Sequence, residues 1–99
     1  MKKTNNILAF YIDGCPYCRQ AREALKELTD GNEKYSEISV EWINENQNPE
    51  ISEKYDYYYV PSMFIGEKKF YEAHRGESFS ECKENVRRVL ETAIQEKIF

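Results

Sequence analysis

The sequence predicts one α/β domain in which a mixed four-stranded sheet is flanked by helices, with the element order β-α-β-α-β-β-α. Three observations lead to this fold class. A continuous apolar run at residues 7–12 passes directly into a helical pattern, strand-like and helical patterns then alternate, and a hairpin around Gly66 precedes a long final helix. A chain of 99 residues fits a single domain over residues 1–99.

The first strand and the first helix meet at a pair of cysteines. The apolar run at residues 7–12 has the length and composition of a central strand that is covered on both faces. Pro16 suits the first position of the following helix, because that position needs no backbone N–H. Turn-forming residues at positions 30–32 end the helix. Its apolar stripe consists of Tyr17, Ala21, Ala24, Leu25 and Leu28.

The middle of the chain predicts a second strand and a second helix. Apolar and polar residues alternate over residues 35–43, which places a strand within residues 36–42. Pro49 then fits a helix start. A helix between two strands predicts a right-handed parallel crossover. The apolar positions of this short amphipathic helix are Ile51, Tyr55 and Tyr58.

The last third of the chain predicts a hairpin and a long helix. Residues 60–65 form the third strand, with Pro61 near its start, where a missing N–H does not interrupt the ladder. A tight turn at Gly66 leads to a fourth strand at residues 69–74, so these two strands pair antiparallel. A capping box at residues 78–81 starts the last helix. Its apolar stripe contains Phe79, Cys82, Val86, Val89, Leu90, Ala93, Ile94 and Ile98.

The junction between the first strand and the first helix carries the chemistry. Cys15 lies at the helix entrance and Cys18 in its first turn, so both sulfurs lie on one side of the helix, close enough to pair. A helix N-terminus stabilises a thiolate. We therefore expect Cys15 to be the nucleophile and Cys18 to resolve the mixed disulfide. Asp13 opposes the thiolate if it points at Cys15, and Arg19 and Arg22 act the other way if they face the site.

Composition limits the partners and the compartment. The formal charge is −4 and no basic run exceeds two residues, which argues against nucleic acid and anionic membranes as partners. The apolar run after the basic start is interrupted by Asp13 and has no cleavage-like site, so we do not expect a signal peptide. The three cysteines cannot form a closed disulfide framework. We expect a cytoplasmic monomer, in which a CxxC pair is redox-active or metal-binding more often than structural.

The segment Cys15-Pro16-Tyr17-Cys18, together with Val60-Pro61 and the apolar strand that follows, resembles the thioredoxin superfamily and in particular its glutaredoxin-like branch. The resemblance covers essentially the whole chain. It implies a thioredoxin-like fold and a thiol–disulfide oxidoreductase that reduces protein disulfides or glutathione mixed disulfides. It also implies a cis peptide bond before Pro61, with the backbone of Val60 binding the substrate. No bound cofactor is implied; glutathione is a candidate co-substrate, and glutathione or a reductase supplies electrons.

The sequence departs from the glutaredoxin pattern where glutathione is recognised. Ile12 stands where these proteins usually have Lys or Arg, and residues 75–79, with one Gly and no Asp, replace their Gly-Gly-Asp. Arg75 offers a substitute contact for a carboxylate, and Ser78 offers N–H groups at a helix start. Tyr17, between the cysteines, is placed for an aromatic contact with the substrate.

Two features of thioredoxins are also missing. Ala9 stands where they carry a buried Asp, and Gly14 where a Trp precedes the first cysteine. The chain therefore combines features of both branches, and the identity of its electron donor stays open.

A metal or iron–sulfur binding module is the alternative function. It would use Cys15 with a thiol from outside the chain. A tetrahedral zinc site within the chain needs four ligands, and the only other His and Cys residues are His74 and Cys82. We expect Cys82 on the apolar stripe to be buried in the core and His74 to be a surface residue.

The tyrosines that precede Pro61 allow two interpretations. They contribute either to packing of the fold or to an aromatic wall beside the thiols; they are Tyr55, Tyr57, Tyr58 and Tyr59. Pro61 itself is either a simple edge-strand proline or the cis proline that the resemblance implies. A third possibility is a partner-binding subunit that keeps the motif without fast thiol chemistry, and slow alkylation of Cys15 would distinguish it.

Overall fold

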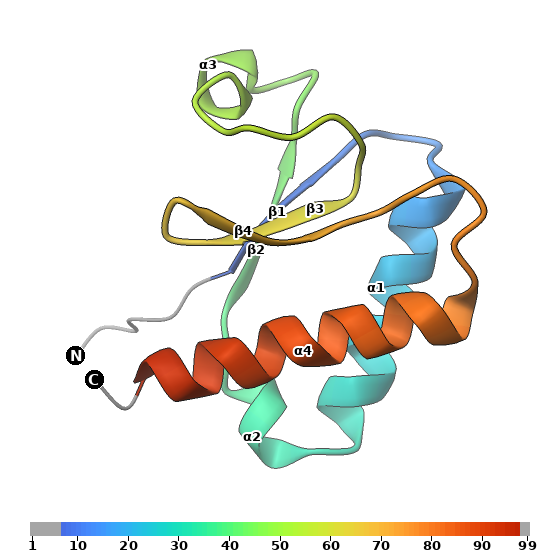
Figure 1. Ribbon diagram of the computed structural model, residues 1–99, viewed down its shortest axis with the longest axis vertical. Helices are drawn as coiled ribbons and strands as arrows, with labels where there is room; N and C mark the ends of the chain where they lie inside the picture. Colours follow the sequence, from blue (N-terminus) through green and yellow to red (C-terminus); the bar gives the residue numbers. More distant parts are fainter. Residues whose placement is uncertain (1–6, 98–99) are drawn as a thin grey trace.

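The computed structural model describes residues 7–97. Ile98, which we placed on the stripe of the last helix, lies outside the described residues. The elements, drawn in Figure 1, are β1 (Ile7–Tyr11), α1 (Pro16–Asp30), α2 (Glu33–Ser36), β2 (Val40–Asn44), α3 (Pro49–Ser52), β3 (Ser62–Ile65), β4 (Lys68–Glu72) and α4 (Phe79–Lys97).

The four strands form one mixed sheet in the order β2-β1-β3-β4. β1 pairs parallel with β2 and antiparallel with β3, and β3 pairs antiparallel with β4. The predicted α/β fold class is confirmed, and the apolar run of β1 is a central strand as expected. The connection from β1 to β2 joins parallel strands, as a crossover requires, but the parallel crossover predicted for the helix between the second and third strands is wrong. β3 runs antiparallel to β1, so the connection through the four-residue α3 does not bring the chain back to the end of the sheet where β1 and β2 begin.

The second strand starts later than the alternation predicted. We placed it within residues 36–42, but Glu33–Ser36 is the short helix α2 and the strand is Val40–Asn44. The side chain of Asn32 caps α2 by accepting a hydrogen bond from the backbone N–H of Lys34 at 2.9 Å. Tyr35 is buried, and its hydroxyl donates to Glu91 on α4. The burial of this tyrosine against α4 therefore overrides the period-two pattern.

The predicted bounds of the next three elements also need correction. α3 ends at Ser52, so Tyr55 and Tyr58 lie beyond it rather than on one helix face. β3 begins at Ser62, directly after Pro61, because proline has no N–H for the ladder. β4 is Lys68–Glu72 rather than residues 69–74, and the chain then turns toward Gly76, which has a φ of +84°.

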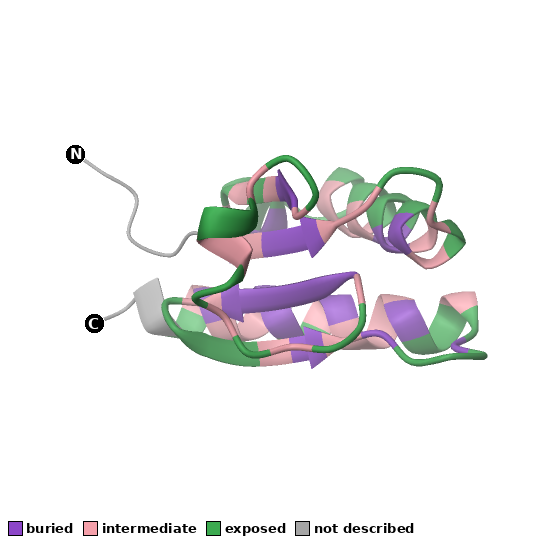
Figure 2. Ribbon diagram, turned by 90° about the horizontal axis from the view of Figure 1, so that it is seen from above, coloured by how far each residue is buried: buried purple, intermediate pink, exposed green. Residues whose placement is uncertain are grey.

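Each face of the sheet has its own core. Figure 1 shows α1, α2 and α4 on one side of the strands and α3 on the other. Figure 2 shows buried residues along the strands, at intervals along the helices, and in part of the loop before α4. On the α3 side, Phe10, Ile43 and Phe64 are buried. The rings of Tyr55 and Tyr57 lie 5.1 and 5.0 Å from that of Phe10, so for these two tyrosines the packing interpretation is correct.

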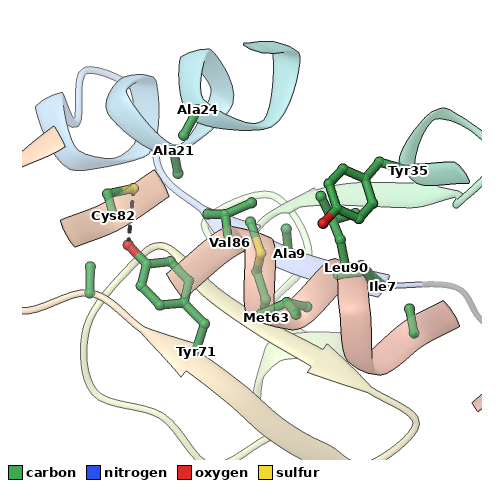
Figure 3. Packing of buried hydrophobic residues seen from close by; sticks show 13 residues of the cluster. Ile7, Ala9, Ala21, Ala24, Tyr35, Met63, Tyr71, Cys82, Val86 and Leu90 are labelled. Atoms are coloured by element: carbon green, nitrogen blue, oxygen red, sulfur yellow. Dashed lines mark hydrogen bonds between the residues drawn. The ribbon is translucent and has the colours of Figure 1, made fainter. Parts of the chain in front are cut away.

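The larger core lies between the sheet and the helices α1 and α4. Small residues at Ala21 and Ala24 lie on the buried side of α1, where α4 packs (Figure 3). Cys82 is fully buried on α4, as predicted, and accepts a hydrogen bond from the Tyr71 hydroxyl at 3.4 Å. Within residues 7–97, no helix combines the length and the apolar character that crossing a membrane requires.

Candidate active site

The two cysteines lie where β1 passes into α1. Cys15 is the N-cap residue of α1, and its sulfur accepts a hydrogen bond from the backbone N–H of Cys18 at 3.3 Å. Pro16 occupies the first helical position, as predicted. Cys15 is half-buried, whereas Cys18 is only 3% exposed. This difference in exposure allows a substrate to reach Cys15 but not Cys18.

Cys15 also faces the segment that precedes β3. Its thiol lies 3.9 Å from the carbonyl oxygen of Val60, to which it donates a weak hydrogen bond. The peptide bond between Val60 and Pro61 is cis, as the resemblance implied. The structure thus brings three of the predicted site residues together from two distant parts of the chain.

Cys18 holds its proton more tightly than an ordinary thiol. Burial and the hydrogen bond with Cys15 raise the pKa of Cys18 to about 12. A backbone hydrogen bond at Ile12 and the positive charge of Arg22 act in the opposite direction and lower this pKa. At neutral pH, Cys18 is therefore a protonated thiol in the reduced protein.

Two of the charged residues around the thiols, Asp13 and Arg22, have defined partners. The Asp13 carboxylate accepts a hydrogen bond from the side-chain amide of Asn44 on β2 at 3.2 Å. The Arg22 guanidinium lies over the rings of Tyr11 and Trp42, 4.8 and 4.2 Å from their centroids. An open pocket of about 530 Å³ lies beside the cysteines. It is lined by Tyr11, Ile12, Asp13, Gly14, Cys15, Cys18, Arg19 and Arg22.

A second pocket, of about 180 Å³, brings together other predicted substrate-binding residues. We call it the Tyr17 groove; its lining is Tyr17, Tyr59, Val60, Ala73, His74 and Arg75. Tyr17 comes from the cysteine motif, whereas Arg75 comes from the loop after β4. The side chain of Arg75 is exposed, so it is free to meet an anionic group of a substrate.

Ser78 is not among the residues that line the Tyr17 groove. Its hydroxyl accepts a hydrogen bond from the backbone N–H of Glu81 at 3.1 Å, which is one half of the predicted capping box. The other half is wrong, because the Glu81 carboxylate bonds to His74 at 2.6 Å instead of returning to Ser78. The exposed side chain of His74 agrees with the predicted surface position.

Glu72 is a residue that sequence analysis did not single out. Its carboxylate accepts hydrogen bonds from the backbone N–H groups of Tyr58 and Tyr59, at 2.5 and 2.6 Å. The same carboxylate forms an ion pair with Lys69 at 2.6 Å. It thereby holds the segment that leads into Val60. No local pattern could have revealed this role, since the two tyrosines lie 13 and 14 residues away in sequence.

The four residues considered for a zinc site do not come together. Among the described residues, the one group of potential metal-ligating side chains is His74, Glu77 and Glu81, whose ligand atoms lie within 4.8 Å of one another. It contains neither Cys15 nor Cys18. The alternative that pairs Cys15 with a thiol from another molecule stays a prediction.

Comparison with known proteins gives the following matches. The family model described as thioredoxin domain matches residues 6–77. Thioredoxin 1 from the thermophilic eubacterium Thermosipho africanus has a similar structure, with a TM-score of 0.57 and 23% identity over 89% of this chain and 97% of that chain. The zinc-bound form of human ERp44 matches with a TM-score of 0.54 and 17% identity, over 86% of this chain and 26% of that one. No curated protein matches the chain in sequence.

Proposed function

Because the chain belongs to the thioredoxin domain family, we propose that it is a glutaredoxin-like dithiol oxidoreductase that reduces protein disulfides or glutathione mixed disulfides. The observation that carries the proposal is the position of the Cys15 sulfur. It lies at a helix N-terminus, 3.3 Å from the backbone nitrogen of Cys18, and 3.9 Å from the carbonyl oxygen beside the cis Pro61. An accessible sulfur that receives an N–H hydrogen bond is suited to act as a thiolate nucleophile.

The reaction takes two exchange steps. The Cys15 thiolate attacks one sulfur of the substrate disulfide, so a Cys15–substrate bond forms and the other sulfur leaves as a thiolate. The Cys18 sulfur then attacks Cys15, which breaks the mixed disulfide and releases the second substrate thiol. The two electrons that reduce the substrate come from the dithiol, which becomes a Cys15–Cys18 disulfide. Glutathione or a reductase returns the protein to the dithiol state, and no bound cofactor is needed.

The burial of Cys18 supports different roles for the two thiols in the reaction. Cys18 lies one helical turn from Cys15 and is 3% exposed, so an external disulfide does not reach it. The raised pKa of Cys18 keeps this thiol protonated until the mixed disulfide has formed. We therefore assign nucleophilic attack to Cys15 and resolution to Cys18.

The substrate is proposed to lie along Val60 and the Tyr17 groove. The backbone of Val60 beside Pro61 binds the extended substrate, and Tyr17 packs against it. Arg75 meets a carboxylate, and the helix start at Ser78 adds N–H groups. We propose that the protein acts as a cytoplasmic monomer.

Glutathione would meet an unusual surface at the loop before α4. The backbone N–H of Gly76 is already bonded to the Tyr17 hydroxyl at 2.7 Å. The Glu77 side chain is buried and accepts hydrogen bonds from Tyr71 and Asn85, at 2.7 and 3.2 Å. Neither group is therefore open to the γ-glutamyl end of glutathione, so that Arg75 and Ser78 would have to supply the contacts.

Two cysteine variants test the mechanism. Cys15→Ser removes the sulfur that forms the mixed disulfide, so disulfide reduction should stop. Cys18→Ser should leave the first step intact and accumulate a mixed disulfide on Cys15, which intact-protein mass spectrometry detects after mixing with an oxidised substrate. Turnover that survives Cys15→Ser would contradict the assignment.

A coupled assay tests the use of glutathione. Reduction of a small glutathione mixed disulfide is followed with glutathione and glutathione reductase. Rapid turnover supports the glutaredoxin-like proposal despite Ile12 and the altered loop at residues 75–78. If turnover is absent while dithiothreitol still drives reduction of a protein disulfide, the donor is a reductase and the glutaredoxin-like part of the proposal is wrong.

A further inference from the structure

The positively charged side chain of Arg22 lines the open pocket beside the cysteines and has a defined position there. Arg22 follows Cys18 by four residues on α1, so the two side chains lie on the same side of the helix, and both line the pocket. The guanidinium rests on the rings of Tyr11 and Trp42, at 4.8 and 4.2 Å from their centroids. The two rings meet edge to face, with centroids 6.1 Å apart.

This arrangement holds the charge near Cys18 without neutralising it. The rings come from β1 and β2, which are neighbouring strands, so the position of Arg22 depends on the sheet and not on the helix alone. A guanidinium stays protonated at every physiological pH. Aromatic rings bind the cation through their quadrupoles and leave its full charge available to a nearby anion.

Cys18 needs such a charge during the second step. To attack Cys15, this buried thiol must become a thiolate, and its surroundings oppose that change. Cys18 is only 3% exposed, so water does little to stabilise its anion, and the hydrogen bond with Cys15 also raises its pKa. Asp13, the carboxylate of the pocket, is hydrogen-bonded to Asn44 at 3.2 Å. The other titratable or charged groups that line the pocket are Tyr11, Cys15 and Arg19.

We propose that Arg22 is a positioning residue that stabilises the Cys18 thiolate while Cys18 attacks the mixed disulfide on Cys15. The inference rests on the proposed dithiol function. In this step the Cys18 proton passes to water in the open pocket, the bond between the Cys15 sulfur and the substrate sulfur breaks, and the Cys15–Cys18 bond forms. The substrate sulfur leaves with the electron pair and takes a proton from water.

The charge effects on Cys18 agree with this role. Burial is the largest influence and raises the pKa of Cys18, and Arg22 is the charged side chain that lowers it. Arg22 is exposed, so solvent screens part of its charge. We therefore expect its effect on the Cys18 thiolate to be moderate.

A chromogenic aromatic disulfide, 5,5′-dithiobis(2-nitrobenzoate), separates the two steps. With less than one equivalent of reagent and stopped-flow detection, the first release of nitrothiobenzoate reports attack by Cys15 and the second reports attack by Cys18. For Arg22→Gln, the second release should slow by about threefold for each unit by which the thiol pKa rises, because lost thiolate is partly offset by greater nucleophilicity. A higher pH should then be needed to reach the wild-type rate. The first release should be unchanged.

Two further variants supply the controls. Arg22→Lys keeps the positive charge and should recover most of the rate of the second release. Arg19→Gln removes the same charge from the same pocket, yet among the described residues Arg19 has no ring contact that holds it near Cys18. It should therefore leave the second release close to wild type. If Arg22→Gln does not fold, comparing Arg22→Lys with Arg22→Met provides the same test.

The outcomes distinguish this inference from the proposed function. If the wild-type protein releases both chromophores and Arg22→Gln matches it at every pH, the role of Arg22 is wrong and the dithiol function stands. If Arg22→Lys is as slow as Arg22→Gln, the charge is not the cause and the inference is also wrong. If the wild-type protein gives no second release, the dithiol function itself fails.

Discussion

The hydroxyl oxygen of Tyr17 accepts a hydrogen bond from the backbone N–H of Gly76 at 2.7 Å, across 59 residues of sequence. A second bond runs beside it, from the side-chain amide of Gln20 to the carbonyl oxygen of Glu77 at 3.2 Å. Together they fasten the loop that carries Arg75 to the helix that carries the cysteines. Tyr17 therefore connects two segments that line the Tyr17 groove, the start of α1 and the loop after β4.

Replacing Tyr17 by Phe should loosen this groove. The ring remains, but the Gly76 N–H loses its partner, which should lower the free energy of unfolding by about 1 kcal/mol. We expect KM for a disulfide substrate to rise while kcat changes little, since Cys15 is untouched. Urea unfolding and steady-state kinetics measure the two effects. Tyr58→Phe is the control, because Tyr58 is 85% exposed. Equal changes in unfolding free energy and KM for the two variants would contradict a role for the Tyr17 hydrogen bond.

Alkylation should distinguish the three thiols of the native protein. Cys18 is 3% exposed with a pKa raised to about 12 by burial, and burial also raises the pKa of the fully buried Cys82. Brief treatment with iodoacetamide at neutral pH should therefore add a single label, on the half-buried Cys15. Peptide mass spectrometry identifies the site, and denatured protein, which should take three labels, is the control. Rapid labelling of Cys18 or Cys82 would contradict the burial.

Replacing Cys82 by Ala should affect stability and not chemistry. The sulfur is fully buried and accepts a hydrogen bond from Tyr71, which keeps its bond to Glu77 in the variant. The small cavity should cost about 1–2 kcal/mol of the free energy of unfolding. Denaturant unfolding measures this loss. A collapse in the rate of disulfide reduction by folded Cys82→Ala protein would show that Cys82 takes part in the reaction.

Replacing Glu72 by Gln should weaken the segment before Val60. Charge-assisted hydrogen bonds to Tyr58 and Tyr59 and the ion pair with Lys69 would be reduced to neutral contacts, at a cost of about 1–2 kcal/mol. Because this segment borders the Tyr17 groove, KM for a disulfide should rise as well. Lys26→Gln breaks an exposed ion pair with Asp30 and should change neither quantity measurably.

The cost of Glu72→Gln should depend on pH. Burial raises the pKa of Glu72, but the hydrogen bonds from Lys69, Tyr59 and Tyr58 outweigh burial and lower the pKa below its usual value. A carboxylate whose pKa is lower in the folded state stabilises the fold above its unfolded pKa, and this contribution is lost as the pH falls through the folded pKa. The difference in unfolding midpoint between wild type and Glu72→Gln should be largest at neutral pH and shrink in acid. A difference that is constant with pH would contradict this account.

Elements with strong local signals were predicted correctly. The apolar run of β1 has few alternatives to a buried strand, and Pro16 marks the first turn of α1. The long stripe of α4, including the burial of Cys82, was also recovered. These patterns depend on neighbours within a few residues, which is the range that sequence periodicity reports.

Short elements were predicted less well because distant contacts decide them. Residues 33–36 became a helix because Tyr35 packs against α4 and bonds to Glu91, more than fifty residues away. Tyr55 left the predicted helix face to pack against Phe10 and Phe64. A four-residue helix has too few hydrogen bonds of its own to resist such contacts.

Local sequence patterns are enough to predict the order of the main elements and the place of Cys15 and Cys18 on a strand–helix junction, and they indicate the thioredoxin superfamily. The groups that surround those thiols are known only from the folded chain. Arg22 rests on two rings from neighbouring strands, and Glu72 holds the tyrosine segment before Val60. Helix starts and apolar runs arise from local backbone chemistry, whereas the environment of a thiol is the sum of burial and charge from residues that only the folded chain brings together.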